Sequence, residues 1–306
     1  MDFTPQKFEY LLQNFKYNGY AFLTLDSFLS LNKTESNLPG KVIILRHDVE
    51  VRYKNALKLA QIESLHGIKG SFYFRIYPQK ENETIISKIA SLGHEIGYHY
   101  DDVSYCKGNM LKALERFCNQ IAYLRQFGPI STITMEGAPL SRYDNRSLWR
   151  HFNLDDCDAI IKVIQDQEIR EALQKFCIPK VSQNKKDITI TIEYVDYKAL
   201  GLKGEPYFDL DYQQIFYLTD TGRCWNGNSY NIRDKVPEQH HWMNRGYSYH
   251  STNDIIKAIE KGHFPSKAII TFHPQRWNDN FGAWSLEFVG QTLKNQIKRI
   301  IVAINS

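Results

Sequence analysis

The stretch KVIILRHDVE, residues 41–50, opens with apolar residues, most of them β-branched, and closes with the run Arg-His-Asp-Val-Glu. A short apolar run of this kind is typical of a buried strand. The segment 53–67 that follows has apolar residues at helical spacing and ends at Gly67, which predicts a helix. Polar residues at the end of such a strand are candidates for function, because chemistry gathers beyond the carboxyl ends of strands in α/β proteins.

The alternation of strand and helix continues along the chain. Further strands are predicted in residues 71–78, 94–100, 130–139, 188–195, 215–227 and 267–277. Further helices are predicted in residues 3–20, 81–93, 110–128, 251–262 and 282–304. This rhythm predicts parallel βαβ units and an α/β fold. Residues 141–235 are less regular and are interpreted as an elaborated insertion within a single domain over residues 1–306.

Composition and charge exclude several classes of protein. With 306 residues, 42% apolar and 24% charged, the chain is globular in composition. The net charge of +4 comes without a dense stripe of Lys and Arg, so nucleic acid is not an expected partner. Apolar runs are strand-sized, which predicts no integral membrane segment. No signal-peptide pattern and no CxxC pair occur, which predicts a cytoplasmic protein with reduced thiols, while its oligomeric state stays open.

Ionisable side chains follow several predicted strands at the point where each strand ends. They are Asp48, Glu50, His99, Glu136, Asp220 and His273. Because the carboxyl ends of parallel strands share one edge of a sheet, we expect these side chains to converge there. Along a strand, Asp48 and Glu50 fall on one face and His47 falls on the other. His94 and His99 fall on opposite faces, so His94 is expected to be structural rather than a second ligand.

Four runs stand out in combination: RHDVE at 46–50, GIKGSFYFR at 67–75, SLGHEIGYHYDD at 91–102 and IITFHPQRW at 269–277. Together they resemble the polysaccharide deacetylases of carbohydrate esterase family 4, and more closely the deacetylase-like proteins of surface-polysaccharide gene clusters. The likeness spans roughly residues 40–277. It implies a distorted (β/α) barrel of about seven parallel strands, a divalent metal ion, often zinc, and hydrolysis of N- or O-acetyl groups on sugars.

The resemblance also implies roles for individual residues. Asp48 matches the aspartate that ligates the metal, His99 matches the first histidine of the metal pair, and His273 matches the general acid. The second metal histidine would stand four residues after His99, where this chain has Val103. His47 stands where the family has its catalytic-base aspartate. The implied ligand set is therefore incomplete, and the implied base is substituted.

Neighbouring side chains could complete the site. A zinc site needs at least three protein ligands with nitrogen, oxygen or sulfur donors. Asp101 is the predicted third ligand, because it lies two residues past His99 and shares its face if the strand continues. The alternatives are Asp102, Glu50 and His273. Glu50 or His47 is predicted to take a proton from water, and His273 to protonate the leaving group.

Carbohydrate is the expected substrate. Tyr100 and Trp277 are predicted to contact a sugar ring, as are Tyr98 and Trp225. Glu136 and Asp220 are predicted to make polar contacts with the substrate. The predicted function is a metal-dependent hydrolase that removes an acetyl group from a sugar or glycan precursor in surface-polysaccharide biosynthesis. Two alternatives stay open, a non-catalytic deacetylase-like protein that binds sugar and a metal-dependent amidohydrolase that acts on another small amide.

Overall fold

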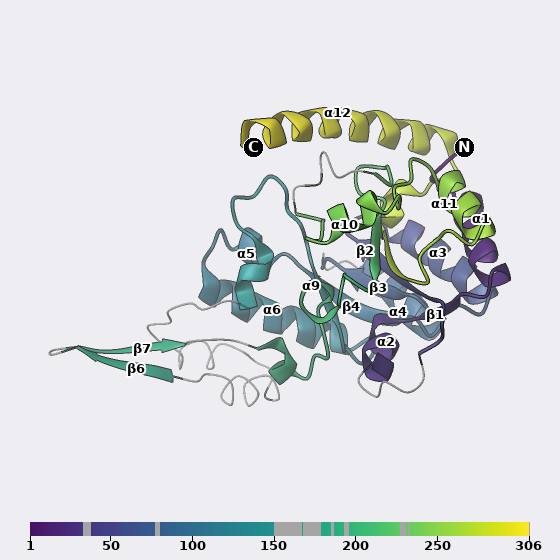
Figure 1. Ribbon diagram of the computed structural model, residues 1–306. Coiled ribbons are helices and arrows are strands. Elements are labelled where there is room, and N and C mark those ends of the chain that lie inside the picture. The colour runs from purple at the N-terminus through teal and green to yellow at the C-terminus, as the bar shows by residue number, and fades with distance from the viewer. Residues whose placement is uncertain are drawn as a thin grey trace. The chain divides into compact units, whose positions relative to one another are not determined.

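The computed structural model describes residues 1–32, 38–76, 80–149, 167, 179–184, 187–192, 196–226, 231 and 233–305 (Figure 1). The chain divides into two compact units, the first made of Met1–Ile96 with Tyr207–Ser306 and the second of Gly97–Pro206. Much of the predicted insertion at 141–235, including residues 150–166 and 168–178, lies outside the described residues. The single domain over residues 1–306 stays a prediction.

A parallel sheet organises the fold. Its strands are β1 (Ala21–Leu23), β2 (Val42–Val49), β3 (Ser71–Phe74), β4 (Glu95–Tyr100), β5 (Ile133–Met135), β8 (Phe216–Thr219) and β9 (Lys267–Phe272). This seven-stranded sheet has the order β5-β4-β3-β2-β9-β8, with β1 beside β2. The strand pairs whose register is described in it all run parallel. The prediction of an α/β fold with parallel strands in a distorted (β/α) barrel is confirmed.

Helices alternate with the strands of the first unit. They are α1 (Pro5–Tyr17), α2 (Leu25–Asn32), α3 (Tyr53–Leu65), α4 (Lys80–Ser91), α10 (Gln239–Asn244), α11 (Thr252–Glu260), η4 (Pro274–Arg276) and α12 (Phe281–Asn305). Local sequence explains two of their starts, because Thr4 caps α1 and Ser251 forms a capping box with Asp254 at α11. Among the described residues, no helix has the length and apolar character needed to cross a membrane.

The second unit contains β5, most of β4, several helices and a separate hairpin. Its helices are α5 (Asp102–Tyr105), α6 (Met110–Arg125), η1 (Asn145–Trp149) and η2 (Tyr197–Leu200), and the short α9 (Pro206–Asp209) follows in sequence. The strands β6 (Pro179–Asn184) and β7 (Asp187–Ile192) pair antiparallel. Helix α6 agrees with the predicted helix at 110–128, and it buries Ala113, Phe117 and Ile121 at helical spacing.

Both faces of the sheet are covered in the first unit. On β9, Ile270 and Phe272 belong to a core that also contains residues of α1 and α11, whereas Ile269 belongs to a second core. On β8, Phe216 joins the first core and Tyr217 the second. Successive side chains of a strand point to opposite faces, so each strand feeds both cores. Helix α1 packs against α3 and α11 (Figure 1).

Strand β2 is paired along its whole length. Its residues Val42–Ile44 pair with β1, its residues Arg46–Val49 pair with β3, and β9 runs along its other edge. Every residue of β2 is buried. Since buried polar side chains need hydrogen-bond partners, the Arg-His-Asp run at the end of β2 must find them inside the protein.

Candidate functional site

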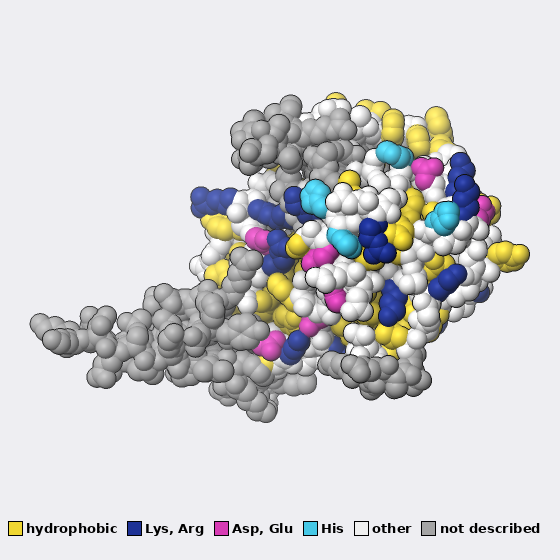
Figure 2. Space-filling view, viewed as in Figure 1, with side chains coloured by type: hydrophobic (Ala, Val, Ile, Leu, Met, Phe, Trp, Pro, Cys, Tyr) yellow, Lys and Arg dark blue, Asp and Glu magenta, His cyan; other side chains and the backbone are white. Residues whose placement is uncertain are grey.

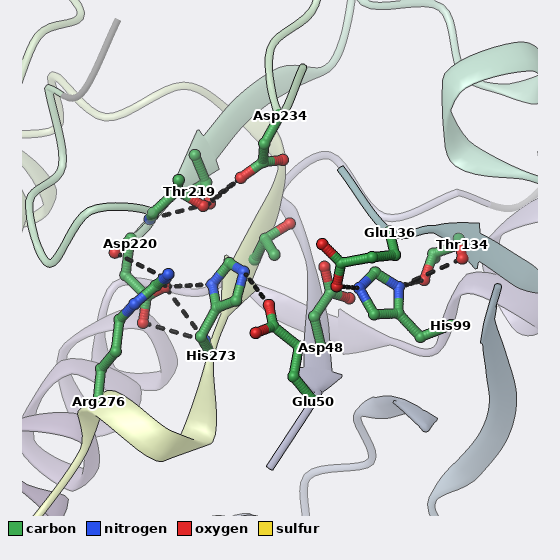
Figure 3. Close-up of polar contacts among 12 residues, drawn as sticks. Asp48, Glu50, His99, Thr134, Glu136, Thr219, Asp220, Asp234, His273 and Arg276 are labelled. Carbon is green, nitrogen blue, oxygen red and sulfur yellow. Dashed lines mark hydrogen bonds and ion pairs between the residues drawn. The ribbon is translucent and has the colours of Figure 1, made fainter. Parts of the chain in front are cut away.

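A buried histidine and aspartate lie at the ends of two neighbouring strands. His273 directly follows β9 and Asp220 directly follows β8, and the parallel pairing of these strands brings them together. His273 Nδ1 lies 2.6 Å from Asp220 Oδ1, and the His273 backbone N–H donates to the same carboxylate (Figure 3). Arg276 Nη1 and Trp277 Nε1 also donate to it, at 2.8 and 2.7 Å. Asp220 therefore fixes the orientation of the His273 ring.

The charge of Asp220 follows from these contacts. Burial raises the pKa of Asp220, but the charges of Arg276 and His273 and their hydrogen bonds outweigh it and hold the pKa below its ordinary value. Asp220 is therefore an ionised acceptor, and Nδ1 of His273 is the protonated donor toward it. The other ring nitrogen, Nε2, lies 3.6 Å from Glu50 Oε1. His273 is thus held so that Nε2 can exchange a proton.

A cavity gives this part of the first unit room for a ligand. It measures 540 Å³, and its lining includes Glu50, Arg52 and Asn55 together with Glu81 and Asn82 of α4. Glu50 belongs both to the lining and to the contact with His273. A molecule in the cavity would therefore lie beside Glu50, at the end of β2.

In the second unit, His99 and Glu136 face each other. His99 lies on β4 opposite Thr134 of β5, and Glu136 directly follows β5. The His99 Nε2 atom is 3.3 Å from Glu136 Oε2, and both residues are buried (Figure 3). On the other side of the ring, His99 Nδ1 lies 3.2 Å from the Thr134 carbonyl oxygen and 2.9 Å from its hydroxyl oxygen. The backbone of β5 therefore orients the ring.

The donor chemistry of this pair suits a bound cation. Since the Thr134 carbonyl can only accept, Nδ1 of His99 is assigned the proton, and Nε2 then presents a lone pair toward Glu136. A lone pair and a carboxylate oxygen attract each other only when a proton or a metal ion is shared between them. The predicted ligand His99 fits a metal site on this ground. Glu136, which was predicted to contact substrate, lies where a second ligand would.

Asp48, the predicted metal-ligating aspartate, is held by Arg46. The Arg46 Nε and Nη2 atoms donate to the two Asp48 carboxylate oxygens at 2.8 and 2.7 Å, and both side chains are buried. A fork of this geometry balances the charge of the carboxylate. A metal ion at Asp48 would have to displace Arg46 or share Asp48 with it, so the ligand role of Asp48 stays a prediction.

His47, a predicted base, faces helix α3. Its Nε2 atom lies 2.5 Å from Glu63 Oε1, and its ring stacks on Phe72 with the centroids 4.1 Å apart. Asp48 contacts Arg46 instead, so the predicted alternation of His47 and Asp48 between the two faces of β2 is confirmed. His47 is fully buried by these contacts. Of the two predicted bases, Glu50 is the one that contacts His273.

His94 has the structural role predicted for it. The Gly70 backbone N–H donates to His94 Nδ1 at 3.1 Å, so Nε2 has the proton and donates to the Ala60 carbonyl at 2.9 Å. Burial lowers the pKa of His94, which favours this neutral form. Glu63 fits beside these groups because Gly70 has no side chain, and a Cβ there would lie 2.4 Å from Glu63 Oε2.

Asp101 does not share the face of His99, because β4 ends at Tyr100 and Asp101 already stands at the N-cap position of helix α5. Arg116 on α6 binds the carboxylates of Asp101 and Asp102, each at 2.6 Å. The condition on which Asp101 was predicted as the third ligand, a strand that continues past His99, is therefore not met. A metal ion at Asp101 would have to compete with Arg116.

Asp102 is expected to make stability depend on pH. Burial raises the pKa of Asp102 to about 7, although Arg116 opposes it. Since the folded state holds this proton at a pH where the unfolded chain has lost it, stability falls as pH rises from about 4 to about 7. Replacing Asp102 with asparagine should flatten that fall. Midpoints of urea unfolding at about pH 4 and about pH 7 measure this fall in stability, with Glu115→Gln as the control. An equal fall in the parent and in Asp102→Asn would contradict the prediction.

The rings predicted to contact sugar are packed inside the two units. Tyr100 is fully buried, and it packs edge-on against Phe117 and Trp149. Trp277 is 1% exposed, and its Nε1 donates to Asp220. Neither ring offers a face to a ligand in this structure. Both serve packing, and Trp277 also helps to hold the aspartate that orients His273. Asp220, also predicted to contact substrate, is fully buried among these donors.

A second aspartate near His273 has no counterpart in the sequence predictions. Asp234 accepts hydrogen bonds from the hydroxyls of Tyr207 and Thr219, at 2.9 and 3.0 Å, and from the hydroxyls of Tyr217 and Thr221. Burial opposes its ionisation, but His273, Arg46 and the hydroxyls lower its pKa. Sequence reasoning missed Asp234 because it follows no predicted strand. Arg46 and Arg276 stood inside quoted motifs and Thr134 inside a predicted strand, but they were given no role.

Comparisons with known proteins give structural matches of low similarity. No protein-family model matches the sequence, and no curated protein matches it significantly. Among solved structures, the chain is similar to IcaB from Ammonifex degensii, with 16% sequence identity and a TM-score of 0.36. The match covers 43% of this chain and 65% of that chain, so the chain spans less than two thirds of IcaB. The function is therefore argued from the side chains described above.

Proposed function

We propose that the protein is a metal-dependent hydrolase that removes an acetyl group from a sugar or glycan precursor. The observation that supports this best is the buried His99 Nε2 atom, which faces Glu136 Oε2 at 3.3 Å while Thr134 holds the opposite side of the ring. An imidazole oriented by a backbone carbonyl and set against a carboxylate is the usual composition of a zinc or related site. The buried Asp220–His273 pair adds a group for proton transfer.

Two side chains of the second unit are proposed to hold the ion: His99 and Glu136. Water or substrate would complete the coordination of the ion. The bound ion would supply Lewis acidity to the acetyl carbonyl and to water.

His273 is proposed to move the proton. Asp220 fixes Nδ1 as the protonated donor, so Nε2 can accept a proton from water and then return it to the departing nitrogen or oxygen of the sugar. Glu50 Oε1, 3.6 Å from Nε2, is a partner for that proton on the side away from Asp220. The buried Arg276 keeps Asp220 ionised throughout.

Removing either member of the second-unit pair is expected to weaken metal binding strongly. His99→Gln and Glu136→Gln each delete one donor, and loss of a ligand lowers affinity by roughly 100-fold or more. Elemental analysis of the purified full chain and titration calorimetry with Zn²⁺ measure this. Asp101→Asn serves as the control, because it removes a carboxylate that Arg116 already binds. Full metal content in His99→Gln would overturn the proposed site.

One observation favours the non-catalytic alternative. Arg46 donates two hydrogen bonds to Asp48, which matches the metal-ligating aspartate of the deacetylases that the sequence resembles. If the parent protein binds no Zn²⁺, Mn²⁺ or Co²⁺ yet still binds acetylated sugars in calorimetry, the protein is a sugar-binding relative of the hydrolases. Turnover of small amides but not of acetylated sugars would identify the amidohydrolase alternative instead.

A further inference from the structure

The carboxylate of Asp234 binds the residues on both sides of Asp220. Its Oδ2 atom accepts a hydrogen bond from the Thr219 hydroxyl at 3.0 Å and another from the Thr221 hydroxyl (Figure 3). Thr219 is the last residue of β8, and Thr221 lies one residue beyond Asp220. Asp234 comes from another part of the first unit, the segment that precedes α10. It therefore holds the chain before and after Asp220, the residue that orients His273.

Asp234 is an ionised acceptor. Burial raises the pKa of Asp234, but the charges of His273 and Arg46 and the hydroxyl donors outweigh it and hold the pKa below its ordinary value. An ionised carboxylate has no proton to donate, so both threonine hydroxyls must donate to it. Their oxygen atoms lie 3.0 Å apart, and the Thr221 N–H donates to the Thr219 hydroxyl oxygen at 3.2 Å. The carboxylate thus fixes both threonine side chains, and with them the turn that they enclose.

Strand β9 and the segment after it hold the other side of this turn. The Asp220 N–H donates to the Thr271 carbonyl at 3.1 Å, and the His273 N–H donates to the Asp220 carboxylate at 3.1 Å. Arg276 Nη1 donates to the Asp220 carbonyl oxygen at 3.0 Å. The turn is thus held from two directions, by β9 and η4 through Asp220 itself and by Asp234 through the hydroxyls of its neighbours.

We propose that Asp234 is a positioning residue, which holds Asp220 in the orientation that keeps the proton of the neutral His273 ring on Nδ1. Only in this tautomer can Nε2 accept a proton. When the turn is held from one direction alone, the Asp220 carboxylate leaves Nδ1 in part of the molecules, and the Nε2–H tautomer gains population. The inference rests on the proposed function for the use of that proton, but the tautomer itself is measured without metal or substrate.

Long-range ¹H–¹⁵N spectra of the full chain, labelled at histidine, test this inference, because the two ring nitrogens have different chemical shifts in each tautomer. The His273 signals are those lost in His273→Gln. At about pH 9, where histidine is ordinarily neutral, the parent should show the Nδ1–H tautomer. In Asp234→Ala and in Thr219→Val/Thr221→Val, the tautomer ratio should shift toward Nε2–H by about tenfold, as expected for the loss of one or two hydrogen bonds.

Tyr207→Phe is the matched control, because it removes another hydroxyl from Asp234 but leaves both threonine contacts. It should keep the parent tautomer, and circular dichroism checks that each variant is folded. The parent tautomer in either test variant, once folded, would overturn the inference. So would a parent protein without a preferred tautomer, because Asp220 would then not hold the ring.

Asp211→Ala is a second control. On the face of the molecule shown in Figure 2, acidic side chains lie scattered among basic and uncharged ones, so the loss of one exposed carboxylate changes the field at His273 little. Asp211 is exposed, and it accepts a hydrogen bond within its own turn. A shift of the His273 tautomer in Asp211→Ala would overturn the inference, because any lost carboxylate would then have the effect assigned to Asp234.

Kinetics separate this inference from the proposed function. With an acetylated sugar as substrate, Asp234→Ala should lower kcat by up to about 100-fold and change KM little, because the misplaced group acts only during the reaction. A parent protein without turnover, whose tautomer still depends on Asp234, would contradict the proposed hydrolysis and support the positioning role.

Discussion

Replacing His273 with glutamine is expected to lower kcat for hydrolysis of an acetylated sugar by about 100- to 10,000-fold. Glutamine keeps a hydrogen-bonding group near Asp220 but cannot take up and return a proton at the position of Nε2. Because the proton moves only during the reaction, KM should change little. Steady-state kinetics of the metal-loaded protein measure both constants.

His263→Gln is the control for this variant, because His263 is an exposed histidine on the loop before β9. It should leave kcat unchanged. If His273→Gln retained the parent kcat, His273 would have no part in proton transfer, and Glu50 would have to serve as both base and acid. Metal content should stay at the parent level in His273→Gln, which separates a defect in proton transfer from loss of the ion.

Replacing Asp220 with alanine is expected to lower the free energy of unfolding by about 3–5 kcal/mol. The substitution leaves the buried Arg276 guanidinium, the Trp277 indole N–H and the His273 ring without their common acceptor. Uncompensated buried charge accounts for most of the loss. Urea unfolding measures it, with Glu260→Ala as an exposed acidic control. A loss under about 1 kcal/mol would mean that water replaces the carboxylate at no large cost.

The same aspartate has a pH signature with a definite sign. Folding lowers the pKa of Asp220 below its ordinary 3.8. Its contribution to stability is therefore complete above about pH 4 and is lost as pH falls through the folded-state pKa. Asp220→Asn, which does not titrate, should lose less stability than the parent between about pH 5 and about pH 3. Equal losses would show that other carboxylates account for the acid sensitivity.

Periodicity in the sequence predicted most of the fold. The buried run at 41–50 became β2, and the helical spacing in 53–67 became α3, because each element satisfies its own pattern locally. Strand β1 and helix α2 were missed. Ala21–Leu23 is too short to show an alternation, and it is a strand because β2 pairs with it. Tertiary pairing of this kind leaves no local signal.

The candidate site was predictable in its location and less so in its contacts. The strand ends predicted His99, His273 and Asp220, because parallel strands share an edge. Which side chains pair there depends on neighbours that the sequence does not reveal. Arg46 pairs with Asp48, and Arg116 pairs with Asp101, and neither partner was predicted. Glu136 was recognised only as a polar strand end, because its closeness to His99 arises from the register of β5 with β4.

Gly70 links the packing of α3 to the site on the opposite face of β2. Its missing methyl group is the space into which the Glu63 carboxylate fits, and the carboxylate in turn holds His47. An added Cβ at position 70 would displace the Glu63 carboxylate and disturb its contact with His47, the residue before Asp48. Substitutions at Gly70 should therefore be tolerated less than its distance from the candidate site suggests. The space left by the missing Cβ of Gly70, on the other side of β2, therefore limits which side chains can stand at position 70.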